Sequence, residues 1–176
     1  DSSLSQIDDI YYDKLIIYNK LLKERNEFLK GYVENEKNNI FLDVIDKKIT
    51  EIGKYIIDAR CSFISELSKN ANNVMKLISN NKEELKLTYF PKVTSDKYDL
   101  ELRSRRKHDI YLQNTSCGPH RDDINILIND YVAATNGSQG QIRSAIIAIK
   151  IGFFEILKAK KEKIIVISSF ILKFCI

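Results

Sequence analysis

The chain has little proline, no tryptophan and no long hydrophobic run. Only 2 of its 176 residues are proline and 6 are glycine, so little in the sequence would break long helices. The longest apolar stretch, Ile164 to Leu172, is far shorter than the ~20 residues that a membrane-spanning helix needs. The first residues have neither the basic start nor the apolar core of a signal peptide. We therefore expect no membrane function.

Cysteine and histidine are also scarce. Cys61, Cys117 and Cys175 are widely spaced and odd in number, which fits a reducing cytoplasm better than a disulfide framework or a zinc site. The two histidines, His108 and His120, have no metal-ligand spacing. We expect a cytoplasmic protein with no metal site and no catalytic residue in this chain.

The overall charge is mild, and basic residues gather in one place. A formal net charge of +4, with 44% hydrophobic and 30% charged residues, is typical of a globular protein and does not by itself identify a nucleic-acid binder. Four cations lie within five residues: Arg103, Arg105, Arg106 and Lys107. They are candidates for DNA contact, and a solvated helix face is the alternative interpretation.

Two long amphipathic helices are predicted in the first half of the chain. Asp8 and Asp9 are candidate caps of the first helix, whose apolar stripe contains Leu15, Tyr18, Leu22 and Leu29. A second stripe with alternating spacings of four and three runs from Ile45 to Leu67. If it continues through Val74 and Leu77, this helix covers about residues 40–79 and is roughly 55–60 Å long. The pattern predicts an antiparallel, coiled-coil-like helical arm.

After Asn80-Asn81 the pattern changes to mixed strands and helices. We expect a strand at 85–89 closed by Pro91, a short helix at about 96–108, a strand near 110–112 and a hairpin at 124–134 with an Asn129-Asp130 turn. A final amphipathic helix after Gly137 is predicted to bury one face, made of Ile142, Ile146, Ile149, Phe153 and Ile156. The predicted fold class is therefore α+β.

The segment Gly137-Ser138-Gln139-Gly140-Gln141 directly precedes this last helix. Helix N-termini present free N–H groups and a positive dipole end, so the segment could bind a phosphate with help from the Ser138 hydroxyl. A simple turn with an N-cap serine explains the same residues. The segment alone leaves both interpretations open.

A second segment, Gly118-Pro119-His120-Arg121-Asp122-Asp123, lies about twenty residues upstream. In this order and spacing, the two segments resemble those that flank one β-hairpin in the RecF family of the ATP-binding-cassette class. Further matching stretches lie at Ser3–Asp8, Tyr18–Asn26 and Leu42–Val44, so the resemblance covers roughly residues 1–160.

The chain also departs from that family's pattern. It has no glycine-rich phosphate loop ending in Gly-Lys-Ser or Gly-Lys-Thr, and no acidic residue follows Glu162, where the family has an acidic strand. We interpret it as a fragment: a helical arm at 1–82, the signature-motif half of an ATPase head at 83–165, and an atypical C-terminal tail at 166–176. A truncation or a reading-frame change would explain the tail.

The resemblance implies roles for specific residues. Ser138, Gln139, Gly140 and Gln141 would contact nucleotide held by a facing protomer. His120, Arg121, Asp122 and Asp123 would support the loop that contains them, with Arg121 and the carboxylates bracing it against the signature loop at 137–141. A metal or acid–base role for these four is disfavoured, since adjacent aspartates in an extended segment point to opposite sides.

The resemblance also implies what the complete protein does. It would be a weak DNA-dependent ATPase that uses ATP and magnesium and forms an ATP-dependent homodimer. It would bind single-stranded and gapped DNA and act with RecR, RecO and RecA in replication, repair and the SOS response. This fragment alone should neither bind ATP tightly nor hydrolyse it. A non-enzymatic helical-hairpin interaction module and a chromosome-maintenance type of ATPase are the alternatives.

Overall fold

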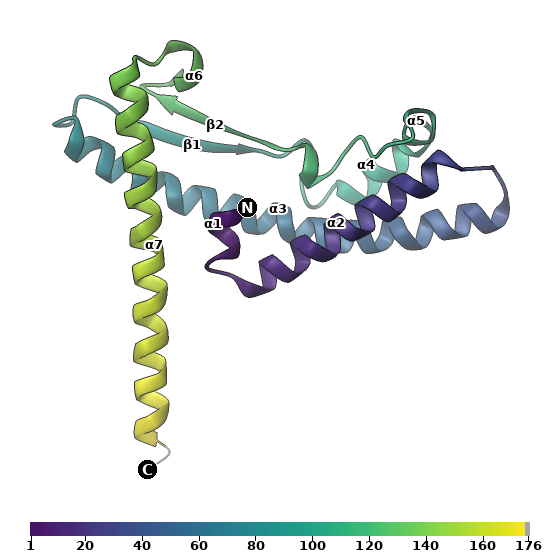
Figure 1. Cartoon of the computed structure of the whole chain (residues 1–176), viewed down its shortest axis with the longest axis horizontal. Coiled ribbons are helices and arrows are strands. Elements are labelled where there is room, and N and C mark those ends of the chain that lie inside the picture. Colours follow the sequence, from purple (N-terminus) through teal and green to yellow (C-terminus); the bar gives the residue numbers. More distant parts are fainter. Residues whose placement is uncertain (175–176) are drawn as a thin grey trace. The chain divides into compact units, whose positions relative to one another are not determined.

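The computed structural model describes the backbone of residues 1–174 and the side chains of residues 1–160. It is mainly helical with one small sheet (Figure 1). The elements in chain order are α1 (Ser2–Ser5), α2 (Asp9–Lys30), α3 (Glu36–Ile78), β1 (Leu85–Phe90), α4 (Tyr98–Ser104), α5 (Arg106–Leu112), a 3-10 turn (Pro119–Arg121), β2 (Asp123–Ile128), β3 (Tyr131–Val132), α6 (Ala133–Asn136) and α7 (Gln139–Phe174). The predicted α+β class with a long helical arm is confirmed.

Contacts divide the chain into two compact units. Unit 1 contains Asp1–Ser62 and Tyr89–Asp123, whereas unit 2 contains Phe63–Thr88 and the chain from Ile124 onward. Each unit contains residues from before and after residue 82, where the sequence predicts the boundary between the arm and the head. This boundary along the sequence stays a prediction.

In unit 1, α2 packs antiparallel to the first part of α3. The N-cap carboxylate of Asp8 accepts a hydrogen bond from the Tyr11 N–H at 2.9 Å, as the sequence predicts. Tyr55 of α3 donates to the same Asp8 at 3.4 Å. At the other end of the helix pair, the ring centroids of Phe28 and Phe41 lie 4.3 Å apart. Early α2 therefore meets later α3, and late α2 meets early α3.

Helix α3 has 43 residues and is about 65 Å long. Its predicted stripe is buried at Ile45, Ile49, Ile56, Phe63 and Leu67. Beyond Leu67, the expected continuation through Val74 and Leu77 is wrong at Leu77, which is 79% exposed. The stripe instead continues through Ala71 and Met75, both fully buried. The spacing of four from Leu67 keeps these residues on the face that packs in unit 2.

The α4–α5 region differs from its prediction. Two short helices replace the single helix at 96–108, and the strand predicted near 110–112 is wrong because those residues belong to α5. Asp109 of α5 is fully buried, and its ion pair described below holds this helix against α2. A short apolar run is ambiguous between strand and helix, and here the long-range contact decides.

Unit 2 is built around the sheet, whose strand order is β1-β2-β3. The hairpin from β2 to β3 pairs Leu127 with Val132 and Ile128 with Tyr131. Its predicted turn at Asn129-Asp130 is confirmed, and both residues have positive φ, 50° and 66°, as a type I′ turn requires. The second strand is only two residues long, because α6 begins at Ala133.

Helix α7 buries a face that is shifted from the predicted one. Ile156 is buried as expected and Ile149 packs partly buried against the core, whereas Ile146 is 48% exposed. The buried positions nearer the start of α7 are the small residues Ala145, Ala148 and Gly152. A Cβ at Gly152 would lie 2.7 Å from the backbone nitrogen of Ala71 in α3. Close approach of the two helix backbones therefore selects small residues over the larger isoleucines.

Candidate functional site

The segment 137–141 forms the start of α7 through a reciprocal capping box. The Ser138 hydroxyl accepts from the Gln141 N–H at 3.2 Å, and the Gln141 side-chain oxygen accepts from the Ser138 N–H at 2.8 Å. The Ser138 carbonyl accepts the first helical hydrogen bond, from the Ile142 N–H at 3.0 Å. Each side chain therefore holds the other in place.

This arrangement leaves a small polar surface open. Within the described part of the chain, the Gln139 and Gly140 N–H groups have no acceptor. A Cβ at Gly140 would meet nothing closer than the Ser138 hydroxyl oxygen at 4.0 Å. The Ser138 hydroxyl hydrogen and the Gln141 side-chain NH₂ group remain as donors. Together with the positive end of the helix dipole, these groups fit an anion such as a terminal phosphate.

In unit 1, His120 belongs to a chain of hydrogen bonds that runs from a partly buried site to a buried one. Its Nδ1 lies 2.8 Å from the Tyr18 hydroxyl, and its Nε2 lies 3.0 Å from the Thr115 carbonyl. Since a carbonyl only accepts, Nε2 carries the proton and Nδ1 accepts from Tyr18. The Tyr98 hydroxyl lies 3.2 Å from that of Tyr18 and completes the chain. Burial holds the pKa of His120 below its usual range, with a further contribution from the Arg121 guanidinium.

Arg121 and Asp122, which follow His120 in the loop at 115–122, also bond to neighbouring residues. Arg121 donates to the Thr115 carbonyl at 3.1 and 3.3 Å. Asp122 accepts from the Lys92 N–H at 2.8 Å and from the Tyr89 hydroxyl. Asp123, by contrast, is exposed. The first three of the four predicted support residues thus bond to residues of unit 1.

Gly118 explains how the loop fits beside the two tyrosines. Its φ is +123°, which side-chain-bearing residues rarely adopt. A Cβ there would clash with the Tyr98 hydroxyl and lie 2.8 Å from the Tyr18 hydroxyl. Only glycine allows the backbone to pass this close.

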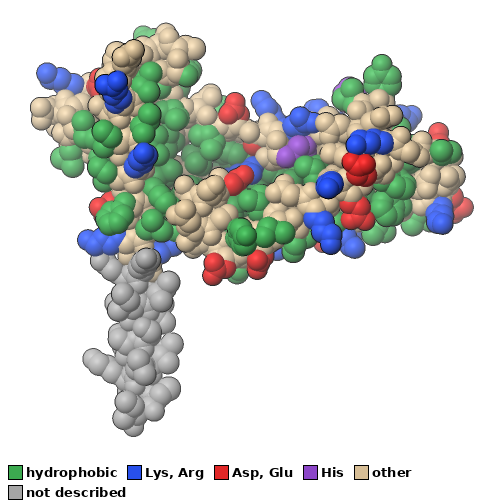
Figure 2. All heavy atoms as spheres, viewed as in Figure 1, with side chains coloured by type: hydrophobic (Ala, Val, Ile, Leu, Met, Phe, Trp, Pro, Cys, Tyr) green, Lys and Arg blue, Asp and Glu red, His purple; other side chains and the backbone are tan. Residues whose placement is uncertain are grey.

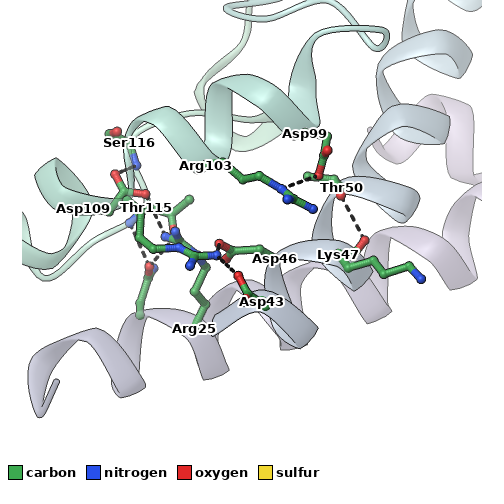
Figure 3. A network of polar contacts seen from close by, with 12 residues as sticks. Arg25, Asp43, Asp46, Lys47, Thr50, Asp99, Arg103, Asp109, Thr115 and Ser116 are labelled. Atoms are coloured by element: carbon green, nitrogen blue, oxygen red, sulfur yellow. Dashed lines mark hydrogen bonds and ion pairs between the residues drawn. The ribbon is translucent and has the colours of Figure 1, made fainter. Parts of the chain in front are cut away.

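A buried arginine, which the sequence analysis did not single out, anchors the same loop (Figure 3). Arg25 has no solvent exposure, and its guanidinium bonds Asp46 at 2.7 Å, Asp109 at 2.8 Å and the Thr115 hydroxyl at 2.8 Å. The residues come from α2, α3, α5 and the loop. Sequence did hold a signal, because positions 11, 18 and 25 are seven apart and the first two are core tyrosines.

The predicted basic cluster is largely neutralised by carboxylates. Arg103 pairs with Asp99 at 3.3 Å and Arg105 with Glu101 at 2.6 Å. Figure 2 shows basic and acidic side chains next to one another on the face where α4 and α5 lie. Arg106 bonds two carboxylates, those of Asp43 at 2.7 Å and Asp46 at 2.8 Å. Among the four, Lys107 alone makes no ion pair with the described side chains.

Other chemical sites are not evident within the described residues. They contain no group of three or more metal-ligating side chains. Cys61 is exposed and Cys117 buried, both as free thiols, and burial raises the pKa of Cys117 to about 12. Cys175 lies outside the described residues. None of the described helices is long and apolar enough to cross a membrane.

The chain is similar to curated bacterial proteins named RecF. The chain is 40% identical over 165 residues to the DNA replication and repair protein RecF of Streptococcus uberis. That match covers 90% of this chain and 44% of the relative. The chain is 35% identical over 163 residues to RecF of Clostridium botulinum strain Okra, with the same coverage. No family model matches the chain.

Solved structures lead to the same family. The recombination mediator protein RecF bound to ATP, described as part of the RecFOR pathway, matches with a TM-score of 0.83 and 32% identity. The match covers 92% of this chain and 46% of that one. The chain therefore spans somewhat less than half the length of the proteins it matches, and over that span it is similar to RecF proteins in both sequence and fold.

Proposed function

We propose that this chain is part of a RecF-type, ATP-dependent DNA replication and repair protein and supplies its signature loop. The observation that carries the proposal is the capped start of α7. Ser138 and Gln141 fix each other, and the Gln139 and Gly140 N–H groups stay available beside a glycine that leaves room for a ligand. The loop would bind the terminal phosphate of ATP held by a facing protomer.

The groups at this loop match the chemistry of that phosphate. A terminal phosphate carries concentrated negative charge, and backbone N–H groups, a hydroxyl and an amide NH₂ can all donate to it. When bound, ATP would supply the anion, and the residues of this loop would bind and orient its last phosphate. Magnesium would be held by the part of the protein that carries the phosphate loop.

An apolar groove in unit 2 fits the idea of an incomplete head. The groove has a volume of about 300 Å³ and lies against β2, β3 and α7, with Ile126, Val132 and Ile146 in its lining. These three side chains are 37–48% exposed. Apolar surface of this kind is usually covered by another protein segment. The sequence contains no phosphate loop, so a nucleotide would need that further segment.

We further propose the cellular role that follows from the family. The complete protein would form an ATP-dependent homodimer in the cytoplasm, bind single-stranded and gapped DNA, and help RecR and RecO load RecA, with a part in the SOS response. Unit 1 would hold the helical arm in a fixed geometry through the contacts of Arg25 and His120. This chain alone is expected to be inactive as an ATPase.

A chimeric RecF protein tests the nucleotide role. The matching segment of the Streptococcus uberis protein, 40% identical, is replaced by this chain, with and without Ser138→Arg. The arginine side chain would fill the space above Gly140 and remove the hydroxyl. We expect the unsubstituted chimera to dimerise with ATP by light scattering, and the Ser138→Arg chimera to bind ATP but remain monomeric.

The exposed Lys48→Arg variant of the same chimera is the control and should dimerise normally. A Ser138→Arg chimera that still dimerises with ATP would contradict the assignment of the loop. In that event the antiparallel α2/α3 pair would favour the second candidate, a helical-hairpin interaction module without a nucleotide role.

A further inference from the structure

We propose that a groove between α2 and α5 binds a single strand of DNA. The groove is an open hollow of about 570 Å³ in unit 1. Its polar lining consists mainly of amide and lysine side chains: Asn19, Lys23, Asn26, Lys30, Gln113 and Asn114. We call it the α2–α5 groove, and its assignment rests on the proposed DNA-related function.

The α2 side of the groove is a single polar stripe. Asn19, Lys23, Asn26 and Lys30 are separated by four, three and four residues, which places them on one face of the helix. Asn26 is oriented by the loop, because its side-chain oxygen accepts from the Thr115 N–H at 2.8 Å and hydroxyl at 2.7 Å. Its NH₂ group is then left as a donor for a ligand.

Helix α5 extends this surface with an exposed aromatic ring. Tyr111 is 83% exposed and Leu112 is 48% exposed, and Leu112 also lines the groove. Lys107 and Tyr111 are four residues apart, so both lie on the outer face of α5. Figure 2 shows hydrophobic side chains protruding near this helix. A tyrosine this exposed gains nothing from folding and is available to stack on a base.

The charge of the surface suits a phosphate backbone. Lys23 and Lys107 make no ion pair with the described side chains, whereas Lys30 pairs with Glu27 at 2.8 Å. Glu27 is the one acidic residue in the lining. Lysine and amide side chains are among the groups that contact phosphate and sugar. The arginines nearby are occupied by Asp and Glu, so the lysines carry the free positive charge.

These features favour a single strand over a duplex. Stacking on Tyr111 requires a base whose face is exposed, which a paired and stacked duplex does not offer. An open groove lined by amide and lysine side chains, with an exposed aromatic ring on the adjoining helix α5, follows the pattern of proteins that bind single strands without sequence preference.

Fluorescence anisotropy with a labelled oligothymidylate tests the proposal on this chain as it stands. The variants are Lys23→Glu/Lys107→Glu, Tyr111→Ala and Tyr111→Phe, and the matched control is Lys47→Glu/Lys48→Glu, two exposed lysines of α3. If Lys23 in the groove and Lys107 on the outer face of α5 each contact one phosphate, losing both lowers the slope of log Kd against log salt by about 1.4. Tyr111→Ala should weaken binding roughly tenfold, and Tyr111→Phe should restore it because the ring remains.

Equal weakening by the groove and control pairs would overturn the proposal, since it would mean that charge alone attracts the DNA. Normal binding by Tyr111→Ala, or no binding by the unchanged chain, would also overturn it. Normal DNA binding by every groove variant would contradict the proposal and favour a protein partner for this surface. The chimera experiment above reads the nucleotide-dependent dimer, so its result separates failure of the proposed function from failure of this groove.

Discussion

Replacing Arg25 with methionine tests whether the buried ion pairs hold unit 1 together. The variant removes a guanidinium with no solvent exposure and keeps a side chain of similar length. Asp46 retains Arg106 at 2.8 Å. Asp109 loses its cation at 2.8 Å and, among the described residues, keeps the Ser116 N–H at 3.0 Å as its side-chain partner. The variant therefore leaves one uncompensated buried carboxylate.

Breaking a buried ion pair by removing one partner typically costs 3–5 kcal/mol. Because Asp46 keeps a partner, we expect about 3 kcal/mol for Arg25→Met, the lower end of that range. The double variant Arg25→Met/Asp109→Leu removes the stranded charge as well and should recover part of the loss.

Urea unfolding followed by circular dichroism measures these free energies. The control is Arg103→Met, which breaks the exposed pair with Asp99 at 3.3 Å and should cost less than about 1 kcal/mol. A cost below about 1 kcal/mol for Arg25→Met would refute the reasoning. So would a double variant less stable than the single one.

Three further results are expected. Since His120 has a lowered pKa in the folded chain, the unfolded chain binds a proton first as the pH falls below 6.5; the unfolding free energy should decrease there, and more weakly in His120→Asn. Ser138→Ala should cost about 1 kcal/mol in thermal unfolding through the lost cap, whereas Gln141→Glu keeps the capping box and should leave stability unchanged. Gly118→Ala should destabilise strongly because of its positive φ and the clash with Tyr98, whereas Gly31→Ala, with open space around it, should not.

Sequence alone predicts the helical arm and the hairpin turn because their signals are local. The stripe from Ile45 to Leu67 has a clear helical period, and Asn129-Asp130 tolerates the positive φ of a tight turn. The strand predicted near 110–112 failed because Asp109 pairs with Arg25, a residue 84 positions earlier. A local pattern cannot contain that contact.

The face of α7 shows a second limit of periodicity. Hydrophobic period favours Ile142, Ile146 and Ile149, and the structure buries Ala145, Ala148 and Gly152 more deeply, with Ile146 exposed. Gly152 is selected by the closeness of the Ala71 backbone in α3. Backbone separation between two helices depends on both partners, so one helix's pattern does not determine which of its faces packs.

The ion pairs of the basic cluster are partly local in sequence and partly long-range. The pairs Asp99/Arg103 and Glu101/Arg105 are four residues apart and could be predicted from the sequence as helical ion pairs. The pair of Arg106 with Asp43 spans 63 positions and could not.

Counting cations within five residues therefore overestimates the charge available to DNA, because it ignores carboxylates one turn away. Of that cluster, Lys107 makes no ion pair with the described side chains, and neither does Lys23 in the lining of the α2–α5 groove. The DNA surface proposed above therefore rests on these lysines, the amides of the groove and the exposed Tyr111 ring, and not on the arginines.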